Sequence, residues 1–248
     1  MKSQIVICIP IGLENRQAIA AALANRYGAE YVFMGRVFQS TISEESCAID
    51  ICDRQTWLDS HAETSLSDDF ELAATKRLDL VTRQRLDRCP QIIYLTADDV
   101  GYDACQQIAR FARVLLEIGG VAVKVESTEI AHSRQKWLAN YDSDDVFEIY
   151  SLYVRLVEGA DYYYSCGMNN FGKADVAIAL DTEIGLAIYV MNVFNYYRLT
   201  ESSILQDGHT FQPDMGCPRY QMQWISDCEA APDSLAYNSQ GRWLLTSC

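Results

Sequence analysis

Residues 90–126, PQIIYLTADDVGYDACQQIARFARVLLEIGGVAVKVE, decide the fold that we expect for this chain. The apolar run QIIYL after Pro90 is typical of a buried strand. Apolar residues then recur at the spacing of an amphipathic helix from Ala104 to Ile118, and Gly119-Gly120 predicts a left-handed helix end. VAVKVE predicts the next strand. The stretch therefore predicts a strand–helix–strand unit, which a right-handed crossover can place within one sheet, whether or not its strands are neighbours.

A similar unit is expected in the N-terminal part of the chain. Residues 15–27 predict a helix that ends at Gly28, and short apolar or β-branched runs predict strands on either side of it. These strands are expected at residues 4–10, 30–38 and 46–52. The charged stretch 63–88 predicts an exposed helix that covers one sheet face, with its charges in solvent.

The C-terminal part adds helices at 143–158 and 183–197 and two final strands, YQMQWI and RWLLTS. The helix at 183–197 is almost entirely apolar and is expected in the core. The predicted fold class is α/β (α+β), with a mixed sheet covered by helices and built from two strand–helix–strand units. Residues 1–248 show no clean boundary, so we expect a single compact domain, with 1–89 and 90–248 as candidate sub-units.

The composition limits the classes of function. The chain has 248 residues, 49% apolar and 22% charged, which is ordinary for a globular protein. Its net charge of -14 argues against nucleic acid or an anionic membrane as partner and is compatible with a basic protein partner. The N-terminus predicts a first strand rather than a signal peptide, and no apolar run approaches a membrane span. Nine cysteines without a C-x-x-C pair predict reduced thiols in a cytoplasmic protein.

Four stretches carry a resemblance to a known family: LLEIGGVAVKVESTEIAHSRQKW, YYSCGMNNFGKADVAI, LQDGHTF and NSQGRWLL. Together they resemble the bacterial DUF4261 domain family, whose function is unknown, over residues 90–247. The first two stretches are the specific ones. The chain departs from the family pattern at Thr128-Glu129, which replaces a second small residue, adds a carboxylate and makes a tight turn less expected there. The resemblance implies a soluble bacterial protein and implies no reaction.

The first cluster of candidate site residues follows the strand VAVKVE. Lys124 and Glu126 are expected on one face near the end of this strand, where ligand sites of α/β sheets commonly form. In a catalytic hypothesis, Glu126 orients His132 as a base and Ser133 is the nucleophile. No Gly-x-Ser-x-Gly elbow surrounds Ser133. The alternative is a structural polar cluster in which Glu126 is satisfied by backbone donors or by His132, with Trp137 packed on the sheet.

The second cluster spans residues 162–175, YYYSCGMNNFGKAD. Tyr162 and Tyr164 are expected on one face of a strand, and Asp175 opens the next strand. Tyrosine, methionine and phenylalanine suit an interface when exposed and a core when buried. Cys166 is expected to be an inert, packed thiol. The candidate binding residues are Lys124, Trp137, Tyr162, Tyr164, Met168, Phe171, Asp175 and His209.

The third cluster is Asp207-Gly208-His209, which predicts a tight turn. With His132 and a carboxylate from Glu126 or Asp175, His209 would complete a two-histidine, one-carboxylate metal set. No H-x-H or H-E-x-x-H spacing supports this set, so no metal is expected. GMNNFG does not match G-x-G-x-x-G and precedes a strand, so no nucleotide cofactor is expected.

Two classes of function remain. The first is a protein-binding module that uses an acidic, tyrosine-rich surface to hold a basic partner, for example an immunity-type protein that neutralises a basic toxin. The second is a hydrolase-like enzyme for a small molecule, with Glu126 and His132 as its acid–base pair and Asp175 or His209 completing the site. Convergence of these side chains in one concave pocket would favour the enzyme, and their separation would favour the binding module. The oligomeric state and the partner's identity are not predicted.

Overall fold

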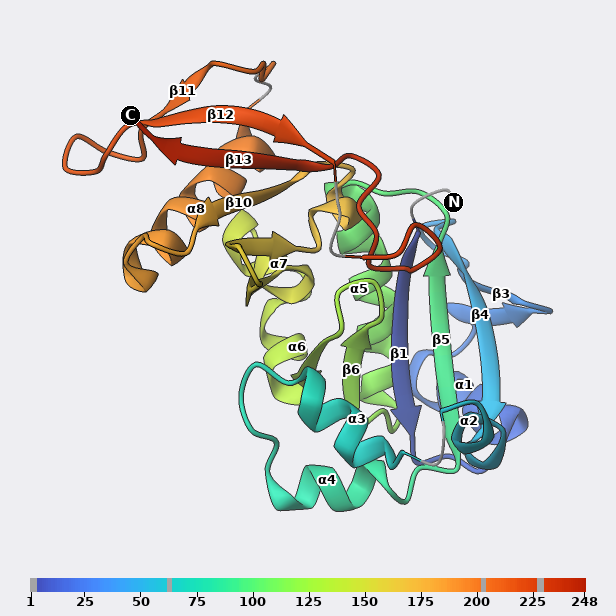
Figure 1. Cartoon of the computed structure of the whole chain (residues 1–248). Helices are drawn as coiled ribbons and strands as arrows, with labels where there is room; N and C mark the ends of the chain where they lie inside the picture. The colour runs from blue at the N-terminus through green and yellow to red at the C-terminus, as the bar shows by residue number, and fades with distance from the viewer. Residues whose placement is uncertain (1–3, 62–63, 202–203, 227–229) are drawn as a thin grey trace.

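The computed structural model describes residues 4–61, 64–201, 204–226 and 230–248, which form two β-sheets and their helices (Figure 1). The strands of the first sheet are β1 (Ile5–Ile11), β2 (Tyr31–Met34), β3 (Val37–Ser40), β4 (Ser46–Asp53), β5 (Gln91–Ala97), β6 (Ala122–Val125) and β7 (Ile130–Ser133). Their order is β2-β3-β4-β5-β1-β6-β7. The mixed α/β class is confirmed, but the single predicted sheet is wrong, because a second sheet forms after residue 154.

The unit that decides the fold is present as β5, α5 (Tyr102–Glu117) and β6. Both of its strands pair antiparallel with β1, so they run parallel to each other on either side of it. The crossover therefore joins two strands of one sheet that are not neighbours. The chain leaves α5 through Gly119, whose φ of 137° favours glycine.

Helices cover both faces of the first sheet (Figure 1). On one face α1 (Arg16–Tyr27) and α5 enclose the larger apolar core, which also takes in Trp137. On the other face lie α2 (Arg54–Ser60), α3 (Leu66–Ala73) and α4 (Leu80–Leu86), which bury Phe70 and Leu86 against the sheet. The single helix predicted over 63–88 is wrong, because Asp79 caps a new helix there, and residue 63 lies outside the described residues.

A hairpin replaces the single strand predicted over residues 30–38. β2 and β3 pair antiparallel, and Met34 and Val37 are the last pair before the turn. Gly35 lies in this turn with a φ of 62°, a conformation that glycine adopts without steric cost. The apolar residues on both sides of this two-residue turn give residues 30–38 the pattern of one continuous strand.

The second sheet contains β8 (Arg155–Glu158), β9 (Tyr162–Cys166), β10 (Asp175–Ala179), β11 (Thr210–Phe211), β12 (Tyr220–Ile225) and β13 (Arg242–Ser247). Their order is β11-β12-β13-β10-β9-β8. Helix α8 (Ile184–Thr200) packs on one face and buries Val190 and Phe194. The predicted helix at 183–197 is confirmed, but only one side is core, because Ile188 and Tyr196 are each 42% exposed.

The predicted helix over 143–158 is too long. Helix α7 (Val146–Tyr153) ends at Val154, and the next four residues form β8 by pairing with β9. Two shorter helices, α6 (Arg134–Asn140) and η1 (Met168–Phe171), complete the region between the sheets. The change of sheet falls between β7 and β8, so the strands after residue 90 include three of the first sheet.

Buried hydrogen bonds join the two halves around η1. The fully buried Asn170 accepts from the Gly101 N–H at 2.8 Å and from the Ser127 hydroxyl at 2.7 Å. The Tyr153 hydroxyl donates to the Cys105 carbonyl at 2.7 Å. These bonds fix the second sheet to α5 of the first. Over the described ranges no helix is long and apolar enough to cross a membrane.

Candidate functional site

The proposed acid–base pair of Glu126 and His132 does not form. In the β6–β7 pairing, His132 lies opposite Val123, and Lys124 lies opposite Ala131. Paired residues share a face and successive residues alternate, so His132 faces the α5 side. Lys124 and Glu126 face the α3 side, where their charged atoms lie 3.4 Å apart. The sheet therefore separates the two members of the predicted pair, which is the physical reason that this hypothesis is wrong.

His132 and Ser133 each have a structural role. The ring of His132 is buried, and its Nε2 must donate to the Leu152 carbonyl, 3.0 Å away, since a carbonyl only accepts. Burial lowers the pKa of His132 to about 4, so the ring is neutral. The Ser133 hydroxyl caps α6 by accepting from the Lys136 N–H. Trp137 is fully buried in the core against this face of the sheet, as the structural alternative predicts, and its indole N–H donates to the Ala109 carbonyl of α5.

Lys124 and Glu126 belong to a buried ion cluster. Both oxygens of the Asp69 carboxylate lie 2.9 Å from the Lys124 ammonium, and Asp69 comes from α3. Burial raises the pKa of Glu126, and the Lys124 charge opposes that shift. The cluster attaches α3 to the sheet and lines none of the three pockets described in this structure.

The remaining candidate binding residues divide into a buried group, in which Met168 is hydrogen-bonded to Asp175, and a more exposed group. Met168 and Phe171 are buried in the core, so they are not interface residues. Tyr164 is half-buried beneath the guanidinium of Arg242, 4.1 Å from its ring centroid, and Tyr162 is also half-buried. His209 is exposed in the predicted Asp207-Gly208 turn. Across the described residues, no group of three or more His, Cys, Asp or Glu side chains could hold a metal, so the two-histidine set does not form.

Asp175 is a buried carboxylate with several donors. It accepts from the Ser165 hydroxyl at 3.0 Å, from the Met168 N–H at 3.2 Å and from the Asn238 amide at 2.6 Å. Burial raises its pKa to about 6, and these hydrogen bonds oppose the shift. Asp175 thus holds β9, η1 and the C-terminal loop together at the start of β10.

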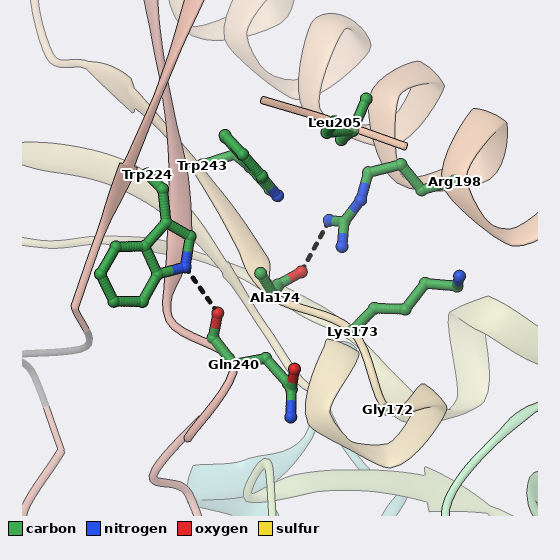
Figure 2. Close-up of a pocket in the computed structure, with 8 residues that line it drawn as sticks. All are labelled: Gly172, Lys173, Ala174, Arg198, Leu205, Trp224, Gln240 and Trp243. Atoms are coloured by element: carbon green, nitrogen blue, oxygen red, sulfur yellow. Dashed lines mark hydrogen bonds between the residues drawn. The ribbon is translucent and has the colours of Figure 1, made fainter. Parts of the chain in front are cut away.

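A pocket of about 300 Å³ lies beside this network, between the C-terminal end of α8, the start of β10 and the strands β12 and β13 (Figure 2). Its lining residues are Gly172, Lys173, Ala174, Arg198, Leu205, Trp224, Gln240 and Trp243. Two of these side chains are cations and two are indoles, in a chain whose net charge is -14. The pocket is therefore the opposite in charge to the molecule that contains it.

The two indoles are placed by the sheet. Trp224 and Trp243 are direct partners in the β12–β13 pairing, so they share the face that carries Met222 and α8. The Trp224 Nε1 donates to the Gln240 carbonyl at 2.8 Å, and Figure 2 shows the Trp243 indole nitrogen turned toward Arg198. Together the rings form one wall of the pocket.

Arg198 is the most unusual residue of the pocket. It is 7% exposed, and its Nη1 donates to the Ala174 carbonyl at 2.6 Å (Figure 2). No carboxylate of the described residues lies within ion-pair distance of its guanidinium. Burial lowers its pKa to about 10, and burial together with Arg198 also lowers the pKa of Lys173. The carboxylate of Asp175 partly opposes this shift of the Arg198 pKa but forms no ion pair with the guanidinium, so an anion in the pocket would add a direct counter-charge.

Sequence reasoning missed this pocket because its residues come from four separate segments. One signal was available: Arg198 follows Val190 and Phe194 at helical spacing, so a cation occupies the buried stripe of an apolar helix. Lys173 lies in the second candidate cluster, residues 162–175, where aromatic side chains are more numerous than charged ones.

Comparison of the chain with family models, with curated protein sequences and with solved structures gave no match in any of the three. The pocket itself therefore carries the functional proposal.

Proposed function

We propose that this chain is a binding module whose cationic pocket holds a carboxylate or phosphate group of a ligand. The observation that carries this proposal is Arg198, a guanidinium in the protein interior that makes one hydrogen bond to a carbonyl and has no ion pair within the described residues. Guanidinium groups are well suited to bind carboxylate and phosphate oxygens.

The other polar groups of the pocket support the same ligand chemistry. Lys173 supplies an ammonium, and Trp243 supplies an indole N–H that is turned toward Arg198 (Figure 2). The nearby carboxylate of Asp175 is already held by Ser165 and Asn238. An anion entering the pocket therefore meets donors and no competing carboxylate in its lining.

The lining also favours binding over catalysis. It contains no carboxylate, imidazole, thiol or hydroxyl, so its one amine, Lys173, has no acid or base partner in the lining. The groups that the catalytic hypothesis needs, Glu126 and His132, lie on opposite faces of the other sheet. A binding module is thus the simplest function that fits this geometry.

Titration with inorganic phosphate at low ionic strength, followed by NMR, tests the proposal. We expect wild type to bind and Arg198→Gln to weaken binding about 10- to 100-fold, because a charged hydrogen bond contributes about 1.5–3 kcal/mol. Arg36→Gln, which removes an exposed cation paired with Asp50, is the matched control and should bind like wild type. Lys173→Gln, at a half-buried position, gives a second readout if Arg198→Gln unfolds. Equal binding by wild type and both pocket variants would contradict the proposal.

The acidic surface supports a second candidate, a basic protein partner. Tyr102 lies near the carboxylates of Asp145, Asp144 and Asp103, whose charges add to burial in raising the pKa of its phenol. The retention of the chain on immobilised polylysine tests this candidate. The double variant Asp103→Asn, Asp144→Asn should elute at lower salt than a control double variant, Glu14→Gln, Asp59→Asn, that removes the same charge elsewhere. Identical elution of the two would rule out this patch as the docking surface.

A further inference from the structure

A second hollow, of about 710 Å³, lies along the same helix as the cationic pocket. Its walls include Val193, Phe194, Tyr197, Leu205, Phe211 and Met222. None of its lining residues is a Lys, Arg, Asp or Glu. Ile204, beside Leu205, is 82% exposed at its rim. The polar side chains of His209, Thr210 and Gln212 also line the hollow, so it is a groove with an apolar wall and no Lys, Arg, Asp or Glu charge, within the size range of small-molecule sites.

The groove and the cationic pocket adjoin each other. Leu205 lines both of them, and Figure 2 shows it above Trp243 and beside Arg198. Tyr197 of the groove precedes Arg198 of the pocket on α8. On β12, Met222 of the groove and Trp224 of the pocket are two residues apart and share one face. The two hollows thus succeed each other along the same helix and the same strand.

We infer that the ligand is an amphiphilic anion, whose carboxylate or phosphate head binds Arg198 and Lys173 and whose apolar chain lies in the groove. This inference rests on the proposed function, because it assigns the head to the same cationic pocket. The charges lie at one end only, so a bare inorganic anion leaves the groove empty, and a neutral apolar molecule leaves Arg198 without a counter-charge. An amphiphilic anion satisfies both hollows at once.

A homologous series of straight-chain carboxylates, from acetate to decanoate below its micelle concentration, tests the inference by calorimetry and NMR. The affinity should rise about fourfold for each added methylene while the chain still fits, because burying one CH₂ contributes about 0.8 kcal/mol. Octyl phosphate against octanoate then distinguishes a phosphate head from a carboxylate head, and either preference fits the inference.

Variants in the cationic pocket and in the groove should have different effects on the carboxylate series. Arg198→Gln should lower the affinity for every carboxylate by the same factor. Val193→Asp, which places a charge in the groove at a half-buried position, should remove the chain-length dependence. Ile188→Asp, on the exposed side of the same helix, is the matched control and should keep the full dependence.

The outcomes separate the two proposals. Binding of acetate and phosphate that depends on Arg198 but gains nothing with chain length would overturn the amphiphile and leave the anion-binding function intact. Chain-length dependence that persists in Val193→Asp would place the apolar chain elsewhere and overturn the groove. Failure of wild type to bind any member of the series, or inorganic phosphate, would overturn both.

Discussion

His132 and Arg198 are both buried, and burial lowers the pKa of both. The consequences differ because their ordinary pKa values differ. At neutral pH His132 loses its charge and becomes a neutral donor to a carbonyl, whereas Arg198 keeps its charge in the interior. Of the two, only Arg198 is a buried charge, and it has no ion pair among the described residues. Equal burial therefore leaves a histidine neutral, which suits a structural role, and leaves an arginine charged, which suits the binding of an anion.

The neutral state of His132 predicts a pH dependence of stability. Between pH 6.5 and about 4 the unfolded chain binds a proton at this residue and the folded chain does not, so stability falls as the pH falls. The contribution approaches about 3 kcal/mol, at about 1.4 kcal/mol for each pKa unit. Urea unfolding of wild type and His132→Gln at several pH values checks it. The difference in stability between the two should change through this window.

Asp175 titrates in an overlapping window with the opposite sign. Its raised pKa means that the folded state takes up the proton first, so acidification from pH 6 toward 4 stabilises the folded state at this residue. The contribution is present in both wild type and His132→Gln and cancels in their difference. A difference that stays constant from pH 7 to 4 would show that His132 does not titrate as expected.

Gly167 gives a second prediction at this scale. Its φ is 125°, and a Cβ there would overlap the Tyr153 carbonyl oxygen, which is backbone and cannot move aside cheaply. Gly167→Ala should lower the free energy of unfolding by about 3 kcal/mol or more, because the positive φ strains the backbone and the new Cβ overlaps the carbonyl oxygen. Gly208→Ala is the control, since Gly208 also has a positive φ of 83° but open space around it. Thermal unfolding should show a large drop for the first and a small one for the second.

At the scale of elements, α3 shows how one charge attaches a helix to a sheet. Asp68 and Asp69 are neighbours on this helix, but Asp69 meets the buried Lys124, whereas the Asp68 side chain is 64% exposed beside Arg83. Removing Asp69 costs Lys124 two charge-assisted hydrogen bonds and leaves Glu126 as its counter-charge, whereas removing an exposed partner changes little. The two positions therefore form a matched pair for experiment.

Asp69→Asn should destabilise the protein by about 3 kcal/mol, and Asp68→Asn by less than about 1 kcal/mol. In Asp69→Asn, hydrogen exchange should show a loss of amide protection first in α3, because the Asp69–Lys124 pair attaches this helix to the sheet. Equal stability of the two variants would mean that solvent reaches Lys124 and that the ion cluster does not hold the helix.

The elements that could be predicted are those whose pattern is complete within one segment. The α5 helix has its apolar stripe, its glycine end and two flanking strands in one stretch, and all of them form. The strand at residues 155–158 could not be predicted, because the apolar spacing there fits either a helix or a strand. Only the pairing with β9 makes this segment a strand. The pairing of Glu126 with His132 could not be judged from the sequence, because the register of the β6–β7 hairpin decides which face of the sheet each side chain occupies. The pocket depends on contacts between four segments, which no local pattern contains.

At the scale of the whole molecule, Asn170 lies where the two halves meet. Its carbonyl and side chain accept from Gly101 and Ser127 of the first half, and its amide donates to Gly167 of the second at 3.0 Å. Because these bonds are buried, neither half can open along the seam without leaving unpaired polar groups. We expect the chain to unfold in one cooperative transition.

Asn170→Ala tests this coupling, since it leaves the Ser127 hydroxyl without its partner and removes one of the two hydrogen bonds that the Gly167 carbonyl accepts. Native-state hydrogen exchange should show the same loss of protection, about 2–4 kcal/mol, in β1 and β5 of the first sheet and in β10 and β13 of the second. Asn169→Ala is the control, because over the described residues the Asn169 side chain bonds to Asn170 and Leu235, so its loss should affect the second half alone. Loss of protection confined to the second sheet in Asn170→Ala would mean that the halves unfold separately, and the ligand pocket could then open while the first sheet stays folded.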